Sequence, residues 1–139
     1  MIAGYYLCLT RNDPANYYDT PEGLLQGFRD ILENMVNPHL LELFYDIPQA
    51  ELIIQGVAES AADGPAAFYI AGSLDGKRPG VFYVNTYKYS SQPRYEMVSL
   101  AMHEANPGHH FQSSYQLEAD WPTFRRVMED RIYSQSPSR

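Results

Sequence analysis

The sequence is poor in cysteine, in positive charge and in long hydrophobic runs, and each shortage excludes a class of protein. Cys8 is the single cysteine, which excludes an internal disulfide and a cysteine-type zinc site. The 10 lysines and arginines face 17 acidic residues, giving a formal net charge of -7, and they form no basic cluster. A nucleic-acid groove needs a basic stripe, so we expect no nucleic-acid partner.

Membrane signals are also scarce. No apolar run reaches the roughly 20 residues that a membrane-spanning helix requires. The first nine residues lack the basic start of a signal peptide. We therefore expect neither a membrane span nor a signal peptide, and the sequence leaves the cellular location open.

The remaining composition is that of an ordinary folded domain. The chain has 139 residues, of which 45% are hydrophobic and 19% are charged. It contains no internal repeat and no low-complexity tract. This length suits one domain with a sizeable core, so residues 1–139 are predicted to form a single domain.

Hydrophobic periodicity predicts a helix early in the chain. Apolar residues recur at spacings of three and four over residues 21–36, which is typical of an amphipathic helix. Thr20 is the expected N-cap, with Pro21 at the first helical position. Asn37-Pro38 should interrupt this helix, and residues 39–45 should form a shorter continuation.

The middle of the chain favours strands, and the end favours helices again. Residues 52–57, 66–70 and 81–87 are short β-type runs, and the third is the richest in β-branched and aromatic residues. A helix over residues 94–104 should then lead to the histidines, and a last helix should follow Trp121-Pro122. This order predicts an α+β fold that is mostly helical, with a small β-sheet beside the histidine-bearing helix.

Three of the four histidines lie within eight residues, in the run His103-Glu104-Ala105-Asn106-Pro107-Gly108-His109-His110. Imidazole and carboxylate side chains bind zinc and move protons near neutral pH. A helical zinc site usually places two histidines four positions apart, with a glutamate beside the first as general base. Here the spacings are six and seven. On an unbroken helix, six positions turn by roughly 600°, and seven positions separate the histidines by roughly 10.5 Å along the axis. A regular helix would therefore not make the site.

The residues between the histidines can change that geometry. Pro107 donates no backbone hydrogen bond, and its ring clashes with the carbonyl four residues back, that of His103. Gly108 can adopt backbone angles that other residues avoid. Together they can insert a kink or bulge. Without them, the run reads His-Glu-Ala-Asn-His, which is the usual zinc-protease spacing.

We therefore predict that His103 and His109 bind Zn²⁺ and that Glu104 is the catalytic general base. His110 is the alternative second metal ligand, or a donor behind the ligands or facing the substrate. The competing interpretation is that these histidines cap a broken helix and bond to backbone carbonyls. Three histidines beside a glutamate, at the end of an apolar helix, favour the metal.

The pattern His-Glu-x-x-Pro-Gly-His-His, followed by Phe111-Gln112, resembles the signature of the domain-of-unknown-function 885 family (DUF885). The resemblance extends to residues 17–31, 73–86 and 93–96. That family is grouped with gluzincin-like metallopeptidases and is largely helical and much longer than this chain. The resemblance implies a partial copy of a larger gluzincin-like catalytic domain. It also implies zinc-dependent hydrolysis of a peptide or small amide substrate.

The same resemblance suggests where the substrate would lie. Residues 81–86 are expected to form an edge strand beside the cleft, where an extended substrate adds its own backbone hydrogen bonds, and plain core packing is the competing interpretation of this strand. Tyr83 and Asn85 would then face either the substrate or the core. Arg94 or Tyr95 is the candidate for holding a substrate carboxylate or oxyanion, and a plain surface role competes with this interpretation for each.

The third metal ligand is the main departure from the family pattern. Gluzincin-like sites take it, usually as glutamate, from a later helix, and the resemblance implies a Glu-Gly-Trp segment that the sequence lacks. Glu118 and Glu129 are the nearest substitutes, but Glu118 follows no matching motif and Glu129 lies among surface charges. We therefore expect this chain to lack the third metal ligand. The alternative function is a non-catalytic module that binds metal weakly at most, or that associates with a partner through exposed apolar faces.

Overall fold

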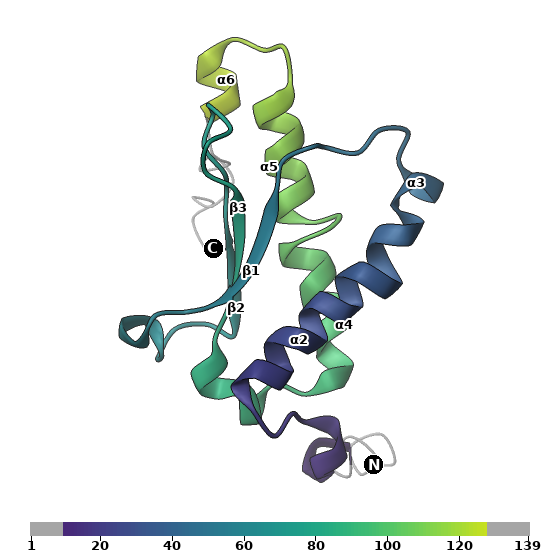
Figure 1. Cartoon of the computed structure of the whole chain (residues 1–139), viewed down its shortest axis with the longest axis vertical. Coiled ribbons are helices and arrows are strands. Elements are labelled where there is room, and N and C mark those ends of the chain that lie inside the picture. The colour runs from purple at the N-terminus through teal and green to yellow at the C-terminus, as the bar shows by residue number, and fades with distance from the viewer. Residues whose placement is uncertain (1–9, 128–139) are drawn as a thin grey trace, which may run out of the picture.

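The computed structural model describes residues 10–127 and confirms an α+β fold built in two layers. One layer is a small β-sheet, and the other is a set of helices along one of its faces (Figure 1). The main helices are α2 (Pro21–Ile31), α4 (Arg94–Glu104) and α5 (His109–Glu118), and the shorter ones are α3 (Leu40–Leu43) and α6 (Thr123–Val127). Among the described helices, none has both the length and the apolar character needed to cross a membrane.

The first main helix begins where its local signals predict. The Thr20 hydroxyl accepts the Gly23 N–H at 3.0 Å, with Pro21 at the first helical position. Beyond Ile31 the helix widens into a π-helical turn, Leu32–Val36, and then tightens into a 3-10 turn, Asn37–His39, that leads into α3. The predicted helix over residues 21–36 and its interruption at Asn37-Pro38 are therefore confirmed.

The sheet has three strands: β1 (Leu52–Gly56), β2 (Ala67–Ile70) and β3 (Gly80–Val84). Their order is β1-β3-β2, with β1 parallel and β2 antiparallel to β3. The expectation of an edge strand at residues 81–86 is therefore wrong. Both sides of β3 already pair with neighbours, so no substrate strand can add to it. Its high β-propensity reflects a central position rather than an exposed edge.

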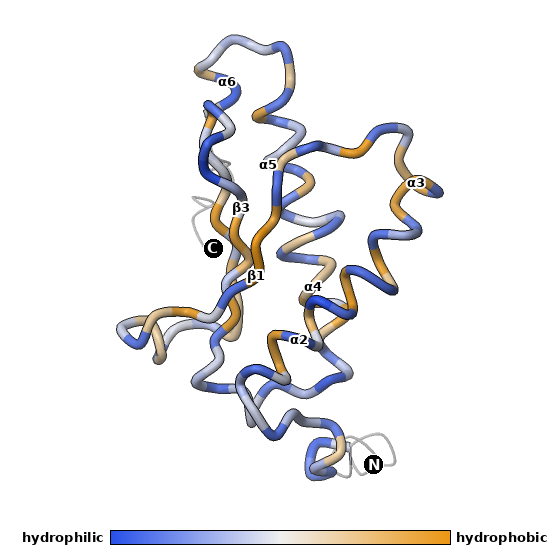
Figure 2. Tube along the Cα trace, in the orientation of Figure 1, coloured by the Kyte–Doolittle hydropathy of each residue, from blue (hydrophilic) through white to orange (hydrophobic). Residues whose placement is uncertain are grey.

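The core lies between the sheet and the helices. Phe82 and Val84 of β3 face the helices, and Phe82 packs edge-to-face against Phe28 of α2 with ring centroids 5.2 Å apart. Met97 and Ala101 bring α4 into the same cluster. In Figure 2, β1 and β3 are mainly orange where they run side by side. Each large side chain buried here contributes roughly 1.5–3 kcal/mol, which fixes α4 against the sheet.

The opposite face of the sheet is apolar and carries no described helix. Phe68 and Tyr83 stack on it with ring centroids 5.0 Å apart and an interplanar angle of 18°. Ile53 and Ile70 are 37% and 41% exposed. Side chains alternate along a strand, so Tyr83 points away from the helices and from the core residue Phe82.

Candidate metal centre

The helix that carries His103 ends one residue later, and a short turn connects it to α5. Glu104 is the last residue of α4, and His109 is the first of α5. The Asn106–Pro107 peptide bond in this turn is cis. A Cβ at position 108 would overlap the carbonyl oxygen of His103, so only glycine allows the backbone to pass this close. The predicted break at Pro107-Gly108 is present.

This turn brings His103 and His109 together. Their ring centroids are 4.7 Å apart, and the rings lie nearly perpendicular, at 83°. Both side chains are exposed. Within residues 10–127, no side chain or backbone group hydrogen-bonds to either ring. All four ring nitrogens are therefore available to a ligand, and imidazole nitrogen is a common zinc ligand.

Glu104 is largely buried. The residue is 9% exposed, and it lines the same cavity as His109. No described group donates a hydrogen bond to its carboxylate. Its carboxylate oxygens are not among the buried side-chain atoms that lack a partner, so they are open to the cavity. The side chain can therefore interact with what enters the cavity.

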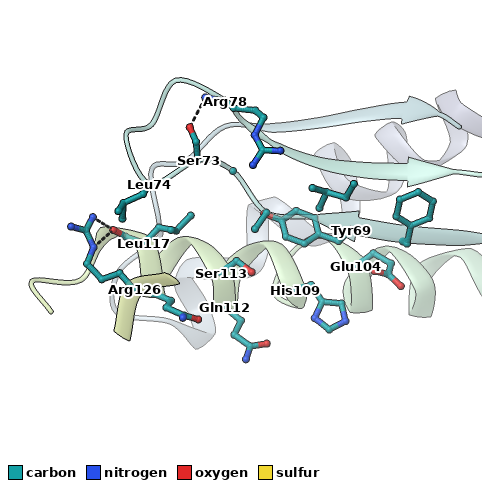
Figure 3. A pocket seen from close by; sticks show the side chains of 15 residues that line it. Tyr69, Ser73, Leu74, Arg78, Glu104, His109, Gln112, Ser113, Leu117 and Arg126 are labelled. Atoms are coloured by element: carbon teal, nitrogen blue, oxygen red, sulfur yellow. Dashed lines mark hydrogen bonds between the residues drawn. The ribbon is translucent and has the colours of Figure 1, made fainter. Parts of the chain in front are cut away.

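That cavity has a volume of about 740 Å³. One wall is β2 with the loop that follows it, residues 68–74, and the other is α5. Figure 3 shows Glu104 and His109 at one end, beneath Tyr69, with Gln112 and Ser113 further along the helix. β2 is an edge strand of the sheet, so the strand beside the histidines is β2 rather than β3.

His110 lies apart from the other two histidines. It is 3% exposed, and its Nδ1 and Nε2 lie 3.0 Å from the Tyr69 hydroxyl and 3.2 Å from the Ala50 carbonyl oxygen. A carbonyl can only accept, so Nε2 carries the proton and donates to Ala50. The Tyr69 hydroxyl then donates to Nδ1. Burial lowers the pKa of His110 and raises the pKa of Tyr69 to about 12, which favours these neutral forms.

Both ring nitrogens of His110 thus serve the fold. The contact also depends on Gly80, because a Cβ there would overlap the Tyr69 hydroxyl and lie 2.7 Å from His110 Nδ1. Of the three candidate metal ligands, the structure pairs His103 with His109. It places His110 where it ties α5 to β2 and to the segment before β1.

Asn85 belongs to the core. The residue is fully buried, and its Nδ2 donates to the carbonyl oxygens of Ala62, Gly64 and Pro65 at 2.9, 3.3 and 3.2 Å. Its Oδ1 accepts the N–H of Tyr87 at 3.2 Å. These contacts end β3 and hold the turn before β2. Asn85 is therefore committed to the fold, whereas the sequence left its facing open.

Tyr83 and Arg94 also lie away from the cavity. Tyr83 stacks on the uncovered face of the sheet. Arg94 donates from Nε to the Tyr17 carbonyl at 3.2 Å, and its guanidinium lies 4.0 Å from the centre of the Tyr18 ring. It begins α4, nine residues before His103, or about 13.5 Å along the helix axis. Arg94 therefore anchors the segment before α2, at the far end of the helix from the histidines.

Glu118, one candidate for the third ligand, does not join the pair. Glu118 ends α5, and its Oε1 accepts the N–H groups of Gln49 and Ala50, both at 2.8 Å. Glu129 lies outside the described residues. Within the part that the structure describes, no three histidine, cysteine or acidic side chains gather as a metal site would require. That part supplies two imidazoles and one cavity-facing carboxylate.

Two cavity residues carry chemistry that the sequence analysis did not single out. Tyr69 reaches His110 from β2, and Arg78 reaches the cavity from the loop before β3. Arg78 stands next to Pro79-Gly80 in the segment noted for its family resemblance, and this was the available signal. For Tyr69 no local signal existed, since its partner is 41 residues away.

Comparisons with known proteins give the family. A family model described as "Bacterial protein of unknown function (DUF885)" matches residues 5–133. The chain belongs to the DUF885 family. The comparison with curated proteins found no match.

A solved structure shares the fold of this DUF885 chain. It is the crystal structure of a protein from Colwellia psychrerythraea that is provisionally described as a lipoprotein, with a TM-score of 0.80 and 27% sequence identity. The match covers 89% of this chain and 22% of that chain. The DUF885 chain therefore spans about a fifth of the length of its solved neighbour, consistent with a partial domain.

Proposed function

We propose that this DUF885 chain carries part of a gluzincin-like zinc site that hydrolyses peptide or small amide bonds. The observation that carries the proposal is the pairing of His103 with His109, whose ring centroids are 4.7 Å apart at a break between two helices. Their ring nitrogens have no partner among the described residues, and Glu104 faces the adjoining cavity. Unpaired polar groups that converge on a cavity are typical of a functional site.

The two histidines and the glutamate have different roles in this proposal. His103 and His109 would hold the zinc through ring nitrogens. A zinc ion supplies Lewis-acid chemistry, because it polarises a carbonyl and lowers the pKa of water. Glu104 takes a proton from the attacking water and passes it to the leaving nitrogen.

Catalytic zinc sites usually have three protein ligands, so one more must join His103 and His109. We infer that it comes from outside residues 10–127, with Glu129 as the candidate within this chain. The match to 22% of the solved neighbour leaves ample sequence in a longer protein to supply it instead. An extended substrate would lie along the edge strand β2, which lines the cavity, and add its backbone hydrogen bonds there.

The second candidate function is a non-catalytic module. The observation in its favour is that, within residues 10–127, no group of three metal-ligating side chains forms. Two imidazoles alone would bind zinc weakly. The uncovered sheet face, with Phe68 and Tyr83 stacked on it, would then be the surface that packs on a partner.

Glu104→Gln separates these functions. The substitution keeps the size of the side chain and removes the base, so zinc content should stay at the wild-type level while hydrolysis of peptide substrates is lost. His39→Ala is the matched control, because His39 is an exposed histidine paired with Glu42 at 2.7 Å, and both measurements should be unchanged. Zinc content is measured by mass spectrometry, and turnover with a mixed peptide library.

Two outcomes would decide against the proposal. Hydrolysis that survives in Glu104→Gln would remove this residue from the mechanism. Weak zinc binding without turnover in the wild-type chain would favour the non-catalytic module.

A further inference from the structure

The cavity beside the histidines has opposite charges at its two ends. Glu104 lies at the end near His109 and Arg126 at the other end, whereas Arg78 lies between them in this view (Figure 3). The cavity follows α5 from His109 to Leu117, which is about 12 Å at the rise of a helix. The two ends are therefore separated by the span of a short extended peptide.

The two arginines differ in their hydrogen bonds to the described part of the chain. The Arg126 guanidinium donates from Nε to the Leu117 carbonyl at 2.8 Å, and a terminal nitrogen donates to the same oxygen. The Arg78 guanidinium makes no hydrogen bond and no ion pair with any described residue. The neighbouring Lys77 is paired with Asp75 at 3.5 Å and does not line the cavity. Among residues 10–127, Arg78 is thus an exposed cation without a partner at the cavity of a chain with a formal net charge of -7.

The loop that carries Arg78 is fixed by its own hydrogen bonds. Ser73 N–H donates to the Arg78 carbonyl at 2.9 Å, and Arg78 N–H donates to the Ser73 hydroxyl oxygen at 2.9 Å. The same hydroxyl donates to Asp75 at 2.5 Å, and Gly76 makes the turn with a φ of 70°. The backbone of Arg78 is therefore ordered before any ligand arrives, which lowers the entropic cost of binding.

We propose that Arg78 binds a carboxylate of the substrate and so restricts this site to anionic peptides or amides. The inference rests on the proposed function, because the cavity is taken as the substrate cleft. A planar guanidinium binds a carboxylate through two parallel hydrogen bonds. Glu104 repels an anion from the end near His109, so the charge pattern also fixes the orientation of the substrate.

Two pairs of acetylated tetrapeptides test this. The first pair is tetra-alanine with a free carboxylate or with an amide at its C-terminus. The second pair has an amidated C-terminus and begins with Glu or with Gln. The wild-type chain should bind the anionic member of at least one pair about tenfold more tightly than its neutral twin, as measured by calorimetry. The pair that shows the difference identifies the carboxylate as terminal or as a side chain.

Arg78→Gln should abolish this preference by weakening only the anionic peptide. Arg78→Lys should keep part of it. Lys77→Gln is the matched control, because it removes the same charge one residue away, outside the cavity, and the preference should persist. Equal binding of the twins by the wild-type chain, binding of neither, or equal losses in Arg78→Gln and Lys77→Gln would overturn the inference.

The binding readout keeps this inference distinct from the proposed function. A preference that depends on Arg78, in a chain that hydrolyses nothing, would support anion recognition and reject hydrolysis. Hydrolysis that depends on Glu104, without any preference between the anionic and neutral peptides, would support hydrolysis and reject anion recognition by Arg78.

Discussion

His109 and His110 are adjacent in the sequence, but the structure places them in opposite surroundings. His109 is exposed, lies against His103 and has no described hydrogen-bond partner. His110 is buried and uses both ring nitrogens, one toward Tyr69 and one toward Ala50. One short run of histidines therefore supplies both a candidate site and the scaffold under it. The two roles are distinguished by hydrogen bonding: a scaffold histidine has partners within the protein, and a candidate ligand has none among the described residues. The position of the histidine in the motif is a weaker guide.

The largest expected effect is on stability when His110 is removed. His110→Ala leaves the partly buried Ala50 carbonyl without its partner and opens a cavity behind Tyr69, so the free energy of unfolding should fall by about 2–4 kcal/mol. His109→Ala removes an exposed ring and should change it by no more than about 0.5 kcal/mol. Urea denaturation of both variants checks this difference. Equal losses would mean that the two histidines share one role.

Substitutions at two glycines should also separate the candidate site from the scaffold. A Cβ at position 108 would overlap the His103 carbonyl, and a Cβ at position 80 would disturb the contact between Tyr69 and His110. Each change to alanine should cost about 1–3 kcal/mol through overpacking. Gly108→Ala should also weaken zinc binding, because it moves His109 relative to His103, whereas Gly80→Ala should leave it largely intact. Calorimetric zinc titration of each variant distinguishes them, and the opposite pattern would contradict the assignment.

The smallest effect is a pH dependence of stability to which His110 should contribute. Burial lowers the pKa of His110 below its ordinary value of 6.5, so the unfolded chain takes up this proton at higher pH than the folded chain. Its contribution to stability is complete above about pH 6.5 and is lost as the pH falls through its lowered folded value. In denaturation between pH 7.5 and pH 5, His110→Gln should show a shallower decline in stability than the wild type. Identical slopes would remove His110 as a source.

Features set by neighbouring residues were predictable from the sequence. The cap at Thr20, the interruption at Asn37-Pro38 and the break at Pro107-Gly108 each depend on side chains within a few positions, and the structure has all three. The pairing of His103 with His109 followed from the break.

Features set by distant partners were not predictable. The strand order puts β3 in the centre, because its pairing with β1 and β2 depends on the whole sheet. Arg94 is held by Tyr17 and Tyr18, 77 and 76 residues away, and Asn85 by a turn more than 20 residues back. A sequence motif identifies side chains that could bind a metal or substrate. Tertiary contacts decide which of those side chains the fold itself uses.

Zinc affinity across the three histidine variants tests the central claim most directly. Calorimetric titration of zinc into His103→Ala, His109→Ala and a folded His110→Gln variant compares the two members of the pair with the scaffold residue. The account predicts that zinc binding is lost in the first two and retained in the third. Undiminished zinc binding in His103→Ala or His109→Ala, or its loss only in His110→Gln, would contradict it.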